Sequence, residues 1–144
     1  MDMKISPITE MRISKLTKNI EQSEKDIKDR KNRGKDISPA TYSVLANNYN
    51  ELFEINRDDN TFKSSIVNIT LAIDSSPHEL QYYAMRATFY MNINNYEKAK
   101  EDIDNIRDKT NLLTGIPKIF VKNIVNDFDT KYTAERILAL RPRP

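Results

Sequence analysis

The chain has 144 residues, which is enough for one domain with its own buried core. Its 23 basic and 21 acidic residues leave a net charge of +2, so charge alone gives no reason to expect a nucleic acid or a membrane as partner. The absence of cysteine excludes disulfides, thiolate metal sites and a cysteine nucleophile. With only Gly34 and Gly115, a glycine-rich phosphate-binding loop is excluded as well. This composition predicts an all-α protein.

The N-terminal stretch MDMKISPITEMRISKL lacks the apolar segment of a secretory signal. No stretch of the chain is apolar over the length that a membrane-spanning helix needs. We therefore expect a cytoplasmic protein that does not enter a membrane.

Three Ser-Pro pairs divide the chain: Ser6-Pro7, Ser38-Pro39 and Ser76-Pro77. Serine is a preferred N-cap, and proline fits the first position of a helix because the N–H that it lacks has no partner there. Glu79 follows Ser76 by three residues and would complete a capping box. The pairs predict three helix starts.

The first amphipathic run extends from Pro7 to about Lys31 and forms a narrow apolar stripe of Ile13, Leu16, Ile20 and Ile27. Beyond Ile20 nearly every side chain is charged. We favour a solvated helix whose far half projects into water over the alternative, an arm for dimerisation or partner docking. Residues 1–36 are thus predicted to be an N-terminal charged helix, which ends at Gly34.

Comparison of the chain with itself shows a spacing of 34 residues. The positions Phe62, Ser65 and Ile69 correspond to Tyr96, Ala99 and Ile103. The spacing continues, less clearly, from Arg86, Ala87 and Tyr90 to Phe120, Val121 and Ile124, and from Ala99 and Ile103 to Thr133 and Ile137. Each unit fits a helical hairpin in which a small residue of the second helix packs against bulky residues of the first.

The segment YAMRATFYMNINNYEKAKEDI, with its Tyr96 and Ala99 pair, resembles the tetratricopeptide repeat (TPR) family. The resemblance covers about residues 39–140. It implies a TPR-like solenoid of three helical hairpins, at about 39–76, 77–110 and 111–140, preceded by the N-terminal helix. The repeat domain would then be residues 37–144, with a short C-terminal tail.

The outer units depart from the pattern. In the first unit, Tyr42, Leu45, Ala46 and Tyr49 lie 41 residues before their counterparts, which predicts a first helix longer by about two turns, from Pro39 to about Arg57. A register that uses Tyr49 and Leu52 instead is the alternative. The second helix would run from Phe62 to Ile73. The third unit has Pro117 where tyrosine is expected, and its second helix would be about Lys131 to Leu140.

We identify no catalytic residue, metal ligand or cofactor site. The single histidine, His78, has no nucleophile or metal partner near it in sequence. Asp58-Asp59-Asn60 lacks the spacing of a calcium loop and is predicted to be a polar turn. The acidic residues between Glu97 and Asp108 alternate with lysine and arginine, as on a solvated helix face.

The TPR resemblance implies a groove, lined by the first helices, that binds another polypeptide. The groove face is predicted to carry polar residues and one methionine: Ser43, Asn47, Asn50, Gln81, Thr88, Met91, Asn92, Lys118 and Lys122. Lys118 and Lys122 would favour an acidic segment. Of the residues by which related repeats hold a chaperone C-terminus, only Asn47 is matched, so that partner is not expected.

The sequence thus predicts a non-catalytic protein–protein interaction module, an adaptor or a subunit of a larger complex. One alternative is a cytoplasmic chaperone of the TPR type for a secreted protein. Another is a purely structural homodimer joined through the N-terminal helix. We do not expect nucleic-acid binding, because no aromatic residues are interleaved with the basic ones.

Overall fold

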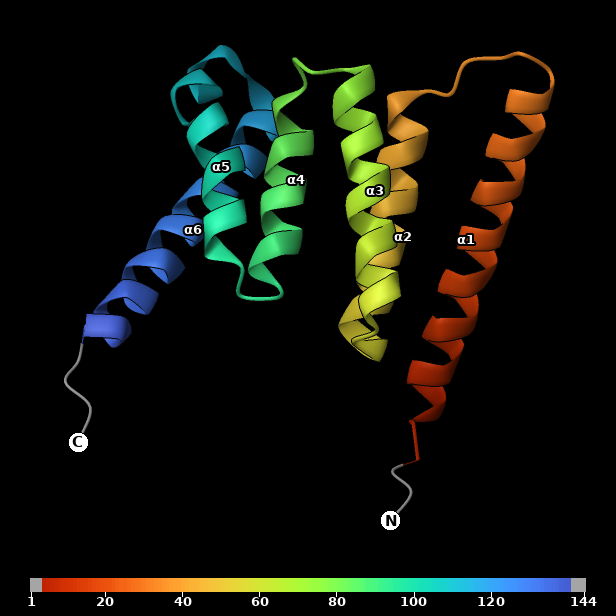
Figure 1. Cartoon of the computed structure of the whole chain (residues 1–144), viewed down its shortest axis with the longest axis horizontal. Coiled ribbons are helices and arrows are strands. Elements are labelled where there is room, and N and C mark those ends of the chain that lie inside the picture. Colours follow the sequence, from red (N-terminus) through yellow and green to blue (C-terminus); the bar gives the residue numbers. More distant parts are fainter. Residues whose placement is uncertain (1–3, 141–144) are drawn as a thin grey trace. The chain divides into compact units, whose positions relative to one another are not determined.

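The structure, a computed structural model, describes residues 4–140, and these residues form helices and connecting segments with no strand. The helices are α1 (Pro7–Asn32), α2 (Pro39–Asn56), α3 (Asp59–Ser75), α4 (Leu80–Met91), α5 (Tyr96–Ile106), the 3₁₀ helix η1 (Arg107–Leu112) and α6 (Gly115–Leu140) (Figure 1). The prediction of an all-α fold is confirmed for this part of the chain. The helices group into two compact units, unit 1 (Met1–Pro77) and unit 2 (His78–Pro144), which are described separately.

Two of the three predicted helix starts are confirmed, and both belong to unit 1. The Ser6 hydroxyl accepts a hydrogen bond from the Thr9 N–H at 3.1 Å, and Pro7 begins α1. The Ser38 hydroxyl accepts one from the Ala40 N–H at 3.2 Å, and Pro39 begins α2. In both cases the serine satisfies an amide that has no partner within the helix.

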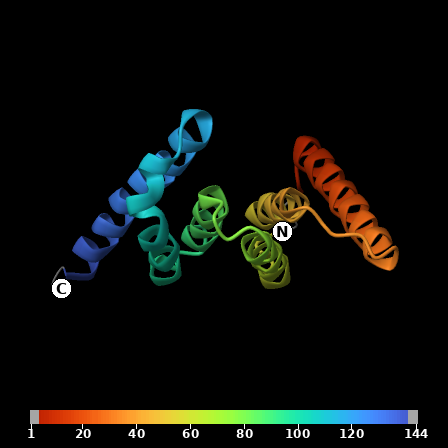
Figure 2. The same cartoon turned by 90° about the horizontal axis from the view of Figure 1, so that it is seen from above.

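Within unit 1, α2 lies between α1 and α3 and packs against both (Figures 1 and 2). The buried side chains of α1 are Leu16, Ile20 and Ile27, which are three of the four residues of the predicted stripe. Since Ile27 belongs to the highly charged half, the interpretation of that half as a helix projecting into water is wrong. Its charged side chains are solvated, but its apolar edge is covered by the unit.

The first hairpin consists of α2 and α3, and α2 has the length predicted from the spacing of 41 residues. Arg57 ends α2 in the left-handed conformation, with φ of 52°. The Asp58 carboxylate then caps α3 by accepting from the Asn60 and Thr61 amides. The helix therefore begins at Asp59, three residues earlier than predicted, and Asp58-Asp59-Asn60 forms a cap and first turn rather than a separate polar turn.

The third predicted helix start is wrong. Ser76 closes α3 instead of opening α4, because its N–H bonds to the carbonyls of Ala72 and Ile73. Pro77 and His78 lie in a turn, and α4 begins at Leu80 with Glu79 as its N-cap residue. A proline after a helix C-cap is as common as a proline at a helix start, so the pair alone does not distinguish the two.

Unit 2 contains the second hairpin, formed by α4 and α5, together with η1 and α6. Asn94 makes the turn with φ of 58°, and the Asn95 side chain caps α5 by accepting from the Lys98 N–H. The core of the unit draws on all three α-helices: Leu80, Ala84, Ala87, Met91, Ala99, Ile103, Ile106, Val121, Val125 and Phe128.

The predicted third hairpin is not formed, because residues 115–140 make one continuous helix, α6. No glycine or proline follows Pro117 before Leu140, so nothing interrupts the helix. Polar side chains in its middle bond one turn along it: Lys131 pairs with Asp127 at 3.1 Å, and the Thr130 hydroxyl donates to the Asn126 carbonyl. Ile137, which the spacing aligned with the buried Ile103, is 54% exposed.

The residues that recur at fixed spacing in the two hairpins have the same environment. Ser65 and Ala99 are fully buried, as are Ile69 and Ile103. Ala46 of α2 and its counterpart Ala87 of α4 are fully buried too. Small residues at these positions let the two helices of each hairpin approach closely.

Replacing Ala99 by leucine should therefore lower the free energy of unfolding by about 1–3 kcal/mol, because three added carbons have no space between α4 and α5. Urea unfolding monitored by circular dichroism measures the loss. Lys98→Leu is the matched control, since Lys98 is exposed on the same helix. Equal stability of the two variants would contradict the close packing of this hairpin.

Candidate functional site

The strongest polar contact in unit 2 joins the two helices of the second hairpin. Arg86 of α4 holds the Asp102 carboxylate of α5 through two hydrogen bonds, from Nε at 2.9 Å and from Nη2 at 2.7 Å. The Asp102 side chain is 5% exposed and that of Arg86 22%. The two-point geometry fixes both side chains and satisfies a charge that burial would otherwise penalise.

Burial raises the pKa of the Asp102 carboxyl above its ordinary value, and the Arg86 guanidinium offsets part of that rise by stabilising the ionised form. The hydrogen bonds to Asp102 in turn raise the pKa of Arg86. The pair has a structural role, because the two charges bind each other and so join α4 to α5.

In unit 1, the three predicted groove residues lie on α2 but differ in exposure. Asn47 is exposed and donates to the Glu51 carboxylate, and the half-buried Ser43 donates to the Ala40 carbonyl. Asn50 is buried and donates to the Glu54 carboxylate. Of the three residues, Asn47 is therefore the one whose side chain is exposed to solvent.

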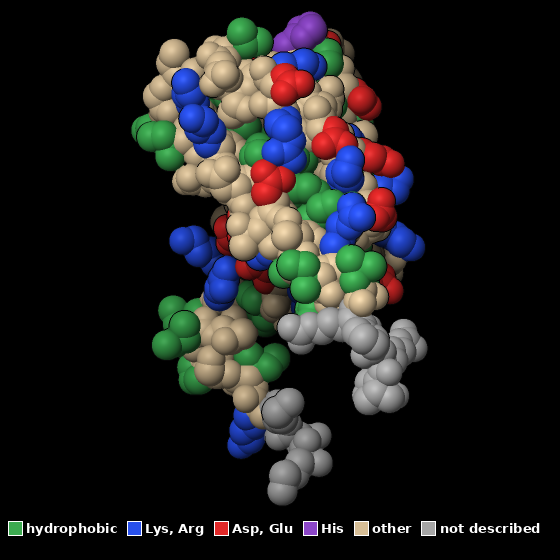
Figure 3. All heavy atoms as spheres, turned by 90° about the vertical axis from the view of Figure 1, so that its left-hand side faces the viewer, with side chains coloured by type: hydrophobic (Ala, Val, Ile, Leu, Met, Phe, Trp, Pro, Cys, Tyr) green, Lys and Arg blue, Asp and Glu red, His purple; other side chains and the backbone are tan. Residues whose placement is uncertain are grey.

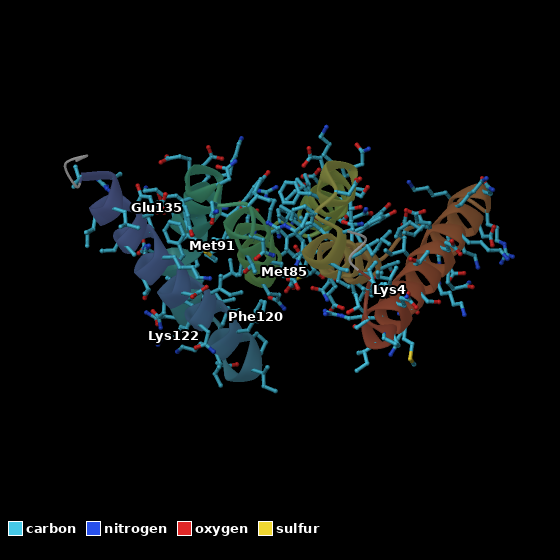
Figure 4. The ribbon with its side chains drawn as sticks, turned by 90° about the horizontal axis from the view of Figure 1, so that it is seen from below. Lys4, Met85, Met91, Phe120, Lys122 and Glu135 are labelled. Carbon is cyan, nitrogen blue, oxygen red and sulfur yellow. The ribbon has the colours of Figure 1, made fainter. Side chains whose placement is uncertain are left out.

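In unit 2, the prediction that Met91 lies on the groove face is wrong. Met91 is only 6% exposed and belongs to the core, between α4 and α6, so it does not lie on the open face (Figure 4). Gln81, Thr88 and Asn92 of α4 are half-buried, and the Thr88 hydroxyl donates to the Ala84 carbonyl. The sequence pattern did not reveal this burial, because it could not show that α6 would pack against α4 and join the same core.

The two lysines predicted for the groove lie in the first turns of α6. Lys118 is half-buried and Lys122 is exposed on the outer side of the helix (Figure 4). Neither forms an ion pair with another residue of the described range 4–140. Ile116, Ile119 and Phe120 of the same turns are exposed, so this end of α6 combines positive charge with apolar surface.

The remaining candidates for chemistry lie at the surface. His78 is exposed, and its purple side chain is visible at the surface in Figure 3. Of the acidic run predicted to form a solvated face, Asp102 is instead buried against Arg86 of α4. At the surface, Asp104 of α5 pairs with Lys100 at 2.5 Å, and Arg107 of η1 pairs with Asp129 of α6 at 2.7 Å. Among residues 4–140, no three histidine, aspartate or glutamate side chains are grouped as metal ligands.

Unit 1 contains a cleft that the sequence did not predict. An open hollow of about 380 Å³ lies over the N-terminal half of α2, with α1 and α3 as its walls. Its lining includes Lys28 and Lys31 of α1, the aromatic and apolar side chains of Tyr42 and Leu45 on α2, and Leu71 on α3. A second hollow of about 480 Å³ continues it, because Lys31 and Tyr42 line both, and it adds Lys35 from the α1–α2 connection. We call the two hollows together the unit 1 cleft.

A hydrogen bond at one end of this cleft joins α1 to α2. The Tyr49 hydroxyl donates to the Glu24 carboxylate. Burial raises the pKa of Tyr49 above its ordinary value, and the hydrogen bond to Glu24 adds to that rise. Tyr49 therefore stays protonated, as a donor that holds α1 against α2.

The lysines of the cleft were interpreted from sequence as part of a solvated face. Lys28 and Lys31 follow Ile27 by one and four residues, and the i, i+4 spacing places Lys31 beside the buried edge of α1 rather than opposite it. That spacing is the signal in the sequence from which the position of these lysines could have been predicted. It could not show that α3 would form the opposite wall of the cleft.

Comparison of the chain with family models, with curated proteins and with solved structures finds no match. No helix within residues 4–140 combines the length and the apolar character required to cross a lipid bilayer.

Replacing Arg86 by methionine should lower the free energy of unfolding by about 2–4 kcal/mol near neutral pH, because the Asp102 charge is then buried without its partner. The pKa of Asp102 in the folded protein, already raised, should rise further above the unfolded value of about 4. Such a group favours the folded state below its unfolded pKa, so the loss should shrink as the pH falls toward 4. Urea unfolding across this pH range measures it.

Arg107→Met is the matched control, because Arg107 holds the Asp129 carboxylate with the same two-point geometry but at the surface. There Arg107 lowers the pKa of Asp129. The contribution of this pair is present above the unfolded pKa and is lost in acid, and solvent screening limits it to about 1 kcal/mol or less. A loss for Arg86→Met no greater than that for Arg107→Met would contradict the role assigned to the buried pair.

Proposed function

We propose that this chain is a non-catalytic protein–protein interaction module of the tetratricopeptide-repeat kind, an adaptor or a subunit of a larger complex. The observation that supports the proposal is the equivalence of the two hairpins: residues 34 apart, Ser65 with Ala99 and Ile69 with Ile103, are buried at the same places. Hairpins repeated in this way present long helical surfaces rather than enclosed pockets, and such surfaces suit the binding of a polypeptide.

The charge pairs of the two units support the same proposal. The Asp102 carboxylate accepts a hydrogen bond from Arg86, and the Glu24 carboxylate accepts one from Tyr49. Each contact joins two helices, so these carboxylates have a structural role. Lys118 and Lys122 form no ion pair with a described residue, and they lie in the same turns as the exposed Ile119 and Phe120. A surface that combines apolar contact with positive charge suits an acidic polypeptide segment.

The proposed binding faces are the polar faces of α2 in unit 1 and of α4 and α6 in unit 2. In unit 2 the face consists of Lys118 and Lys122 with Gln81, Thr88 and Asn92, whereas Met91 is excluded because it is buried. A dedicated chaperone for a secreted protein is a special case of the same proposal. The identity of the captured partner distinguishes it from an adaptor.

Reversing the charge at both Lys118 and Lys122 to glutamate should abolish capture of the partner, because an acidic segment would then be repelled. The measurement is affinity capture from cells of native origin, with identification of the bound proteins, at unchanged helicity by circular dichroism. Lys15→Glu with Lys18→Glu is the matched control, since these exposed residues of α1 carry the same change of charge. Capture that is unaltered by the change at Lys118 and Lys122 would contradict this binding face.

A homodimer through the N-terminal helix is the second candidate, and one observation favours it. Ile8 and Met11, in the first turns of α1, are 80% and 73% exposed. Their burial against a second copy would remove apolar surface from water. Light scattering should then give the mass of a dimer for the chain and of a monomer for Ile8→Lys with Met11→Lys. A monomeric mass for both would exclude the homodimer.

A further inference from the structure

Three lysines that form no ion pair with a described residue line the unit 1 cleft. Lys28 and Lys31 line its first hollow, and Lys31 and Lys35 line its second. None of the three forms an ion pair within residues 4–140, whereas other lysines, such as Lys100 and Lys131, pair with aspartates on their own helices. Unpaired ammonium groups that line a cleft attract carboxylates or phosphates.

The floor of the cleft is apolar, and its far wall on α3 places Leu71 beside the polar side chain of Asn68. Leu45 is fully buried beneath it, and Tyr42 is buried beside the point where the two hollows meet. Leu71 of α3, which is 36% exposed, is the apolar side chain that remains open on the far wall. A ligand that fits both features needs an apolar body as well as negative charge.

The volume of the cleft and the carboxylates that line it restrict the class of ligand that it can bind. The first hollow alone, at about 380 Å³, is near the lower limit of ligand pockets, and a volume of this size accommodates a large apolar side chain. Glu24 lines the first hollow and Asp36 lines the second. These carboxylates would repel the continuous negative charge of a nucleic acid, which also offers no apolar side chain. A peptide can instead place separate carboxylates opposite the lysines.

We propose that the unit 1 cleft binds an acidic peptide segment in which a large apolar side chain is flanked by carboxylates. The apolar side chain inserts against Leu45 and Leu71, and the flanking carboxylates pair with Lys28 and Lys31. Lys35 extends the same charge along the second hollow. This surface is separate from the lysines of α6, and it shares with the proposed function only the premise that the chain binds polypeptides.

The test uses the full chain and a short fluorescent synthetic peptide in which leucine and phenylalanine are flanked by glutamates. Fluorescence anisotropy should show binding that weakens with added salt. One control peptide replaces each glutamate by glutamine, and another replaces the leucine and phenylalanine by alanine. Both should bind at least about tenfold more weakly, since each lacks one of the two features that the cleft recognises.

Charge reversal of both Lys28 and Lys31 to glutamate should weaken binding of the glutamate peptide by at least about tenfold. Substitution of the same two residues by glutamine, which does not repel Glu24, gives a second variant in case the reversal disturbs α1. Leu71→Asp should weaken binding as well, because the exposed wall of the cleft becomes polar and negative. Circular dichroism verifies that each variant keeps its helices.

Two double variants separate this proposal from the proposed function. Glutamate at Lys15 and Lys18, on the same helix but outside the cleft, should leave peptide binding unchanged, and so should glutamate at Lys118 and Lys122. Loss of peptide binding in the Lys118 and Lys122 variant alone would assign the peptide to the face of α6 and overturn the cleft. Loss of cellular partner capture in that variant, with peptide binding intact, would support both surfaces.

Three further outcomes would overturn the proposal. They are the absence of binding to the unaltered chain, equal binding of the glutamine peptide, and equal binding by the variant with glutamine at Lys28 and Lys31. A single-stranded oligonucleotide that displaces the peptide from the unaltered chain, but does not bind the Lys28 and Lys31 variants, would assign the cleft to nucleic acid instead.

Discussion

The close approach of two helices at small side chains is the constraint on which each hairpin depends. Ser65 and Ala99 are fully buried on the second helices, and Ala46 and Ala87 are fully buried on the first. Large residues can fill the spaces around these contacts only because the helix backbones are already near one another. In the second hairpin this approach also brings Arg86 within 2.7 Å of the buried Asp102, which adds a directional contact to the apolar ones.

The sequence predicted the parts of the fold that local chemistry determines. Ser6 and Ser38 cap helices as expected, and the buried residues of both hairpins follow the spacing of 34. It failed where one pattern has two structural meanings. Ser76-Pro77 fits the end of one helix as well as the start of the next, and Thr133 and Ile137 fit a helical spacing whether or not a turn precedes them. The candidate site was predicted less well, because the burial of Met91 depends on α6, and the cleft beside Lys28 depends on α3.

The surfaces of the two units differ in how their charges are used. On α5, η1 and the middle of α6, lysine and arginine are paired with aspartates. On the second half of α1 and at the start of α6, the lysines have no such partners among the described residues, and they lie beside apolar side chains. A surface that has already neutralised its charge offers little to a charged ligand. Electrostatic attraction and apolar contact can act together where unpaired lysines lie beside apolar side chains, as they do at these two places.

The largest packing interfaces among the described residues join helices that are consecutive in sequence, α1 with α2, α2 with α3, and α4 with α5. Contacts of this kind cost little loop entropy to form, and chains rich in them fold rapidly. Each hairpin can therefore assemble as soon as its second helix leaves the ribosome, without waiting for the remainder of the polypeptide. The core of unit 2 is the exception, because Val121, Val125 and Phe128 of α6 complete it only after α4 and α5 have been synthesised.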